Sequence, residues 1–176
     1  MDLSQIQALT LPYDRLSNVI ACSVNVGYPK SLLNEGVVQT FIPHIAIWDT
    51  GATNSAITEL FAQKLGLVQT GIKDVSGLGG TIEKKTYLID LQLPNGKLFL
   101  DLPITEIDNA KDKAGNKIDN FGILIGMDII GTGDFTITNF ENKTTMTFRT
   151  PSLKKVDYVD EWNRRAKVEG KFNPKR

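Results

Sequence analysis

The feature that most constrains this chain is an apolar run, residues 41–48, that ends at an acidic residue, Asp49. Its aromatic and β-branched side chains are typical of a strand buried in a core. A carboxylate at the end of such a strand is costly to bury unless it is hydrogen-bonded, paired or used for chemistry. Gly51, two residues later, allows backbone to approach the carboxylate closely. The sequence therefore predicts a strand that carries Asp49 into a tight turn.

Composition narrows the classes of function. The 176 residues, 41% of them hydrophobic, suffice for one domain with a sizeable core. Twenty basic and twenty acidic residues cancel, so no net charge attracts nucleic acid or an anionic membrane. The single histidine, His44, argues against a His-based metal site or triad, and the single cysteine, Cys22, excludes an internal disulfide. Cys22 lies in an apolar run, which favours core packing over a reactive thiol.

The chain also lacks the patterns of export and membrane insertion. The N-terminus has no basic region followed by a long apolar core, and no apolar stretch approaches the length of a membrane span. We therefore expect a cytoplasmic protein that has neither a membrane nor nucleic acid as a partner.

A second motif follows downstream, at residues 121–130. It consists of an apolar run, Gly126 and a short segment of helical type. Either motif alone is also compatible with an ordinary buried strand and turn. Together and in this order, the D-T-G-A turn and the I-L-I-G segment resemble the retropepsin-like (retroviral-type) aspartic protease family. The form D-T-G-A-T-x-S at residues 49–55 is closer to the cellular and bacterial members than to the retroviral enzymes.

The resemblance implies a mainly β fold, the closed β-barrel of acid proteases, with a short helix after the D-T-G loop and a C-terminal helix. It covers about residues 19–148. We expect an N-terminal arm at residues 1–18, a protease domain at 19–150, and a C-terminal helix with a basic tail at 151–176. The sequence of this N-terminal segment carries the weakest pattern, because it is compatible with a short helix as well as with an arm.

Local patterns predict several elements within this frame. Thr58 and Gly66 are suited to begin and end a short helix after the turn. The segment Pro-Asn-Gly-Lys at residues 94–97 predicts a turn between two strands. Threonines alternate with apolar residues over 135–148, which predicts a hairpin. Apolar residues at three-residue spacing, ending at Trp162, predict an amphipathic helix that supports packing or a dimer rather than a nucleic-acid patch.

The resemblance implies roles for the residues of both motifs. Asp49 would be the catalytic acid and base, and Thr50 would brace its turn against that of a partner subunit. Gly51 would present its backbone to substrate. The remaining expected members are Ala52 in the active-site turn, and Ile125 and Gly126 as its support. Asp128, just beyond the second motif, reads as a helix cap or a supporting group.

A glycine-rich stretch predicts a further part of the site. Three glycines in four positions lie between two strand-like segments, which indicates a hairpin with a flexible tip. In the family, a hairpin at this point is the flap that closes over bound peptide, whereas a plain turn is the alternative. A phosphate-binding loop is excluded, because no G-K-[ST] sequence follows. The flap residues are Ser76, Gly77, Leu78, Gly79 and Gly80.

The chemistry requires two carboxylates. Aspartic proteolysis uses a pair of Asp groups that share a proton, and this chain has one D-T-G. A symmetric homodimer, in which each subunit contributes Asp49, is the simplest way to build the pair. We expect an aspartic endopeptidase that hydrolyses peptide or protein substrates without metal or cofactor. The alternatives are a catalytically silent retropepsin-like module for peptide binding or dimerisation, and an ordinary β-barrel interaction module with a chance D-T-G.

The chain departs from the retroviral pattern near the turn. Retroviral enzymes carry acidic residues after D-T-G-A and a basic residue after the second glycine, which form a dimer-stabilising ion pair. Here those positions hold Thr53, Asn54 and Met127, so the dimer contacts must differ. Trp48 is bulkier than the residue usual before the catalytic Asp. It can pack in the core or crowd the site.

Overall fold

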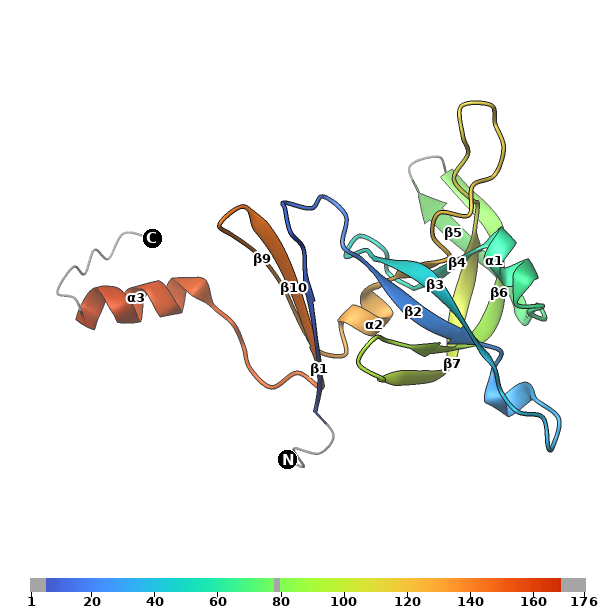
Figure 1. The fold of residues 1–176 in the computed structure, drawn as a ribbon, viewed down its shortest axis with the longest axis horizontal. Coiled ribbons are helices and arrows are strands. Elements are labelled where there is room, and N and C mark those ends of the chain that lie inside the picture. The colour runs from blue at the N-terminus through green and yellow to red at the C-terminus, as the bar shows by residue number, and fades with distance from the viewer. Residues whose placement is uncertain (1–5, 78–79, 169–176) are drawn as a thin grey trace.

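The protein, seen in a computed structural model that describes residues 6–77 and 80–168, is built mainly of β-strands (Figure 1). The strands are β1 (Gln7–Pro12), β2 (Ala21–Gly27), β3 (Phe41–Trp48), β4 (Ala56–Thr58), β5 (Gly71–Gly77), β6 (Gly80–Gln92), β7 (Leu98–Ile107), β8 (Ile123–Ile125), β9 (Asp134–Phe140) and β10 (Lys143–Thr150). The helices are the 3-10 turn η2 (Lys30–Leu32), α1 (Glu59–Lys64), α2 (Met127–Ile130) and α3 (Tyr158–Val168).

The larger sheet holds the candidate site. Its seven strands run in the order β2-β3-β8-β4-β7-β6-β5. Strand β2 also pairs with β6, so β2 has hydrogen-bonded neighbours on both sides. Most neighbours are antiparallel, but β8 lies parallel to β3, and β4 lies parallel to β7. The predicted turn at 94–97 joins β6 to β7, with Gly96 at a φ of 84°. Because β3 and β8 are parallel neighbours, the D-T-G turn that follows β3 and the glycine that follows β8 lie at the same end of the sheet.

The smaller sheet has the order β1-β10-β9. The predicted hairpin forms β9 and β10, and Glu141 and Asn142 take positive φ angles of 51° and 60° at its turn. The N-terminal segment, compatible in sequence with a helix or an arm, instead forms β1, an edge strand antiparallel to β10. The alternation of Leu9 and Leu11 with exposed residues explains this choice, because their side chains reach the core from one face of a strand.

Trp48 joins the two sheets. Its indole is 5% exposed, stacks on Phe135 with ring centroids 5.6 Å apart, and contacts Phe148 at 5.2 Å. Its Nε1–H donates a hydrogen bond to Cys22 Sγ at 3.3 Å. Burial raises the pKa of the Cys22 thiol above its usual range, as expected for a packing residue. Trp48 therefore packs in the core and does not crowd the site.

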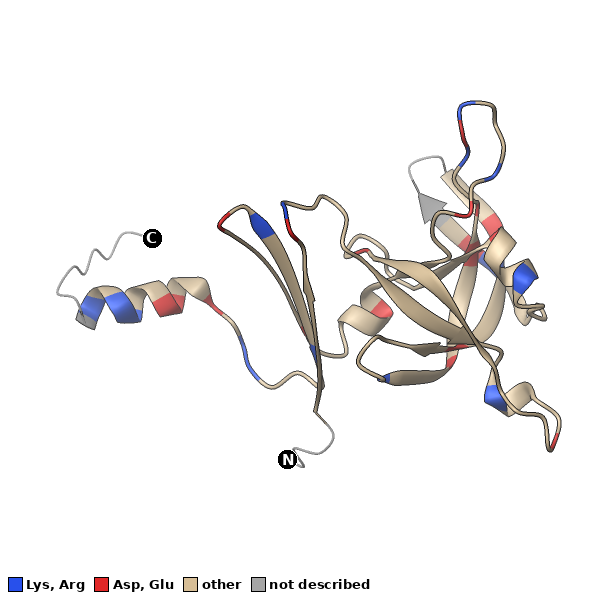
Figure 2. Ribbon diagram, viewed as in Figure 1, with Lys and Arg blue, Asp and Glu red and all other residues tan. Residues whose placement is uncertain are grey.

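The predicted helices are present with two differences of detail. Helix α1 begins after Thr58, but the Thr58 hydroxyl makes no capping bond and is buried without a partner among the described residues. Gly66, at a φ of 64°, follows the end of α1 as predicted. Helix α3 extends away from both sheets, and Val159 and Trp162 are 56% and 71% exposed (Figure 1). Acidic residues lie in its first turn and basic residues in its last (Figure 2).

Candidate active site

The D-T-G turn follows directly from the end of β3. The Asp49 backbone N–H donates a hydrogen bond to the carbonyl of Ile125 at 2.9 Å, which continues the parallel pairing with β8. Its Oδ1 accepts the Gly51 N–H at 2.8 Å, and its carbonyl accepts the Ala52 N–H at 3.2 Å. The side chain is half-buried. The backbone of the turn therefore binds one oxygen of the Asp49 carboxylate, Oδ1. The other oxygen, Oδ2, has no hydrogen bond to a described residue.

The second motif supports this turn through its backbone. Trp48 pairs with Ile125 in the register of β3 and β8, and the Met127 N–H donates to the carbonyl of Ala52 at 2.8 Å. Gly126 lies so close to the turn that an added Cβ would be 2.5 Å from the carbonyl carbon of Asn54. Ile125 and Gly126 are both buried. The expected contact of the I-L-I-G strand with the D-T-G loop is therefore present.

A side-chain pair, the buried Ser55 and the half-buried Asp128, braces the same contact. The carboxylate of Asp128 accepts the Ser55 N–H at 2.9 Å and the Ser55 hydroxyl at 2.7 Å. The Ser55 oxygen in turn accepts the Gly126 N–H at 3.1 Å. Asp128 also accepts the N–H of Ile129 at 3.0 Å, in the first turn of α2. Asp128 is a supporting group, as the sequence predicted, whereas the role of Ser55 was visible only as the last letter of D-T-G-A-T-x-S.

Replacing Ser55 by Ala is expected to destabilise the protein by about 1–3 kcal/mol. The change leaves the Gly126 N–H without its acceptor and one Asp128 oxygen without a donor, in a place where Ser55 is fully buried. Urea unfolding followed by circular dichroism measures the effect. Ser23→Ala on the exposed side of β2 serves as the control, and equal stability of the two variants would contradict the bracing role.

A cavity of about 470 Å³ opens beside the turn. Gly51 and Ala52 of the predicted active-site turn line it on one side, and β5 of the predicted flap hairpin lines it on the other. The full lining comprises Gly51, Ala52, Thr53, Asn54, Ala56, Lys73, Asp74, Val75, Thr105, Ile107 and Leu124. Motif reasoning did not find Lys73, Val75 or Thr105, because lysine, valine and threonine in strands carry no distinctive pattern.

Three of the predicted flap residues, Ser76, Gly77 and Gly80, lie at the end of the β5–β6 hairpin. Antiparallel pairing continues from Gly71↔Thr86 through Ser76↔Thr81 to Gly77↔Gly80. Gly80 has a φ of 105°, which only glycine adopts readily. Leu78 and Gly79 lie outside the described residues. Thr50, at the other side of the site, is exposed.

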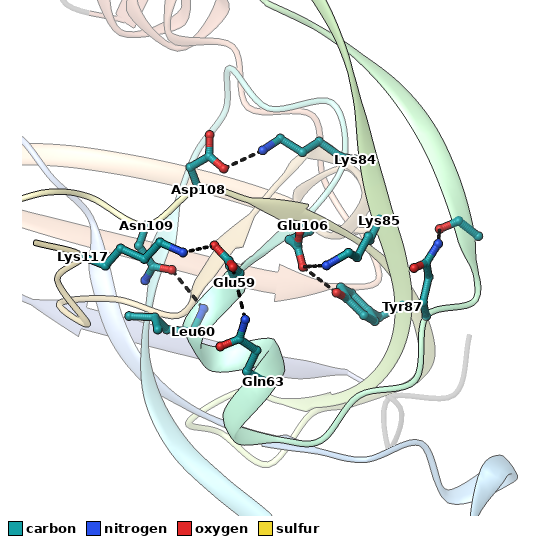
Figure 3. A network of polar contacts seen from close by, with 12 residues as sticks. Glu59, Leu60, Gln63, Lys84, Lys85, Tyr87, Glu106, Asp108, Asn109 and Lys117 are labelled. Carbon is teal, nitrogen blue, oxygen red and sulfur yellow. Dashed lines mark hydrogen bonds and ion pairs between the residues drawn. The ribbon is translucent and has the colours of Figure 1, made fainter.

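A network of ion pairs and hydrogen bonds links β6 to β7 and the residue that follows it (Figure 3). Lys84 binds Asp108 at 2.6 Å and holds the pKa of that carboxyl below its usual range, chiefly through the hydrogen bond. Glu106 accepts the Tyr87 hydroxyl and lies 3.7 Å from Lys85. Burial, and then the Glu106 hydrogen bond, raise the pKa of Tyr87 well above its usual range. These contacts tie β6 to β7 and so fix one wall of the cavity.

The solved structures that are similar to this chain include two proteases. The first is a retropepsin-like aspartic protease from Rickettsia conorii, with a TM-score of 0.46 and 15% identity over 83% of this chain and 96% of that one. The second is EIAV protease complexed with the inhibitor HBY-793, with a TM-score of 0.44 and 16% identity over 69% of this chain and 92% of that one. Both are proteases. No protein-family model and no curated protein matches the sequence.

Two further features are absent from the described part of the chain. Within residues 6–77 and 80–168, no group of three or more His, Cys, Asp or Glu side chains is arranged to hold a metal ion. In those same ranges, no helix is long and apolar enough to cross a membrane.

Proposed function

We propose that this protein is an aspartic endopeptidase that works as a homodimer, with Asp49 of each subunit forming the catalytic pair. The observation that carries the proposal is the D-T-G turn itself. Its carboxylate is held by the Gly51 N–H at 2.8 Å, its backbone is braced by Gly126 and Met127, and Gly51 opens onto a cavity. A carboxylate that a backbone N–H orients beside a cavity is what acid–base catalysis on a bound chain requires.

The chemistry follows from pairing two such carboxylates across a two-fold axis. Two Asp groups in contact cannot both ionise, so they share a proton, and their apparent pKa values separate. The ionised Asp49 takes a proton from water as it attacks the peptide carbonyl, and the protonated Asp49 donates to the carbonyl oxygen. Thr50, exposed at the tip of the turn, is suited to contact the partner turn.

The shape of the cavity determines the orientation of a bound peptide. An extended substrate fits between the D-T-G turn and β5, where strand backbone offers hydrogen bonds as in strand addition. Ala56, Val75, Ile107 and Leu124 give the cavity an apolar floor for substrate side chains. The flap role of Ser76 to Gly80 and the cytoplasmic location belong to the same proposal.

A mixing experiment tests the shared pair. The wild type is first assayed on a random peptide library from acidic to neutral pH, and the cleaved peptides become substrates. Adding a tenfold excess of Asp49→Asn protein is then expected to lower wild-type activity to about a tenth, because most wild-type chains enter mixed dimers. An excess of Asp14→Asn protein, altered at an exposed turn, is expected to add activity.

The outcomes separate the two functions that the turn allows. Undiminished activity in the presence of excess Asp49→Asn protein would overturn the shared pair. A wild type that binds peptides, forms a dimer and cleaves nothing at any pH would identify the catalytically silent peptide-binding module instead.

A further inference from the structure

Lys73, on β5, differs from the other lysines of its hairpin. Lys84 and Lys85 form ion pairs with the carboxylates of Asp108 and Glu106 (Figure 3). The Lys73 ammonium instead donates to a neutral acceptor, Asn54 Oδ1, at 2.9 Å. Among residues 6–77 and 80–168, no carboxylate lies within 4.0 Å of it. Lys73 therefore presents a positive charge that this part of the chain does not neutralise.

The position of this charge suits it to bind an anionic group in the cavity. Lys73 and Asn54 both line the cavity beside the active-site turn, whose other walls include Ala56, Ile107 and Leu124. An ammonium group has three donors, and Asn54 accepts one, so two remain for a group in the cavity. Lys73 is itself exposed, so water screens its attraction to an anion, and we expect a modest effect.

Asp74 also borders the cavity but does not cancel this charge. Successive side chains of a strand point to opposite faces, so Asp74 lies on the other face of β5 from Lys73 and Val75. Asp74 pairs across the hairpin with Glu83 in the strand register, whereas Lys73 pairs with Lys84. The face that carries Lys73 also carries Lys84, which Asp108 neutralises, so Lys73 supplies the remaining positive charge of the described residues there.

We propose that Lys73 makes the cavity a subsite for an acidic substrate residue, so that the enzyme prefers peptides with Asp or Glu at the position that fills it. The inference rests on the proposed function and names its substrate class. The aliphatic part of the substrate side chain packs on the apolar floor. Its carboxylate takes the two free donors of Lys73, while Asn54 holds the ammonium in place.

The test uses peptides that the wild type cleaves. Each is resynthesised in pairs with Glu or Gln at every position flanking the cleaved bond, and kcat/KM is measured for both members. At one position, Glu is expected to exceed Gln by about fivefold, the range of a partly exposed charge pair. Lys73→Met is expected to abolish that ratio. Asn54→Asp, which supplies a carboxylate to Lys73 without changing its size, is expected to abolish it too.

A matched control and a binding assay make the result decisive. Lys85→Met removes the same charge from the other face of the hairpin and is expected to keep the Glu preference. In parallel, an equimolar random peptide library is passed over immobilised Asp49→Asn protein, and retained peptides are sequenced by mass spectrometry. Cleavage without any acidic preference overturns the inference and leaves the protease intact. If the wild type cleaves nothing, retention of acidic peptides by the Asp49→Asn protein supports the subsite and overturns proteolysis. Retention of peptides without acidic enrichment overturns the subsite.

Discussion

Replacing Asp49 by Asn is expected to lower kcat/KM for peptide cleavage by about a thousandfold or more, with little change in stability. The Asn oxygen can still accept the Gly51 N–H, and the backbone bonds to Ile125 and Ala52 do not involve the side chain. What is lost is the carboxyl group that takes and gives a proton in the proposed reaction. The fold is therefore expected to survive a change that removes the chemistry.

Two measurements check this result. Activity on the peptides selected by the wild type gives kcat/KM, and thermal unfolding followed by circular dichroism gives Tm for the same preparation. Asp14→Asn is the control, since Asp14 is an exposed turn residue outside the site. An Asp49→Asn protein that folds normally and keeps more than about a tenth of the activity would exclude Asp49 as the catalytic acid and base.

Replacing Gly126 by Ala is expected to destabilise the protein by about 3 kcal/mol and to remove activity almost completely. The new Cβ would lie 2.5 Å from the carbonyl carbon of Asn54 and 2.9 Å from the nitrogen of Ser55. Both atoms belong to backbone, which cannot rotate away as a side chain can. The D-T-G turn must therefore move off the second motif, and Asp49 moves with it.

The control distinguishes this clash from the ordinary effect of losing a glycine. Gly115 lies in an exposed loop with a φ of 87°, and a Cβ there meets no atom within 4 Å. Gly115→Ala is expected to cost about 1 kcal/mol of backbone strain and no activity. Chemical denaturation of both variants gives the comparison. A Gly126→Ala protein as stable and active as Gly115→Ala would show that the close contact does not matter.

Local patterns predicted much of the fold. The strand before Asp49, the turn at 94–97, the hairpin of β9 and β10 and the end of α1 at Gly66 all depend on residues close in sequence. Glycines at positive φ, alternating threonines and apolar runs limit the backbone directly, without help from distant contacts. The meeting of the two motifs came from family resemblance, and β3 beside β8 agrees with it.

Contacts between distant residues were decided only by the tertiary structure. The N-terminal segment becomes a strand because β10 offers it a partner more than 130 residues away, which no local pattern records. Trp48 could pack or crowd the site, and the rings of Phe135 and Phe148 settle it in the core.

In the candidate site, too, some features follow from the sequence and others only from the tertiary structure. The sequence by itself singled out Asp49 and its glycine turn, because a carboxylate after a buried strand needs a special environment wherever the rest of the chain lies. The catalytic role of Asp49 came from the resemblance of its motif to a family. The Ser55–Asp128 brace and the Lys73–Asn54 contact were decided by the fold. Serine, lysine and asparagine are common on any surface, and they acquire a role only when folding brings a partner within hydrogen-bond distance.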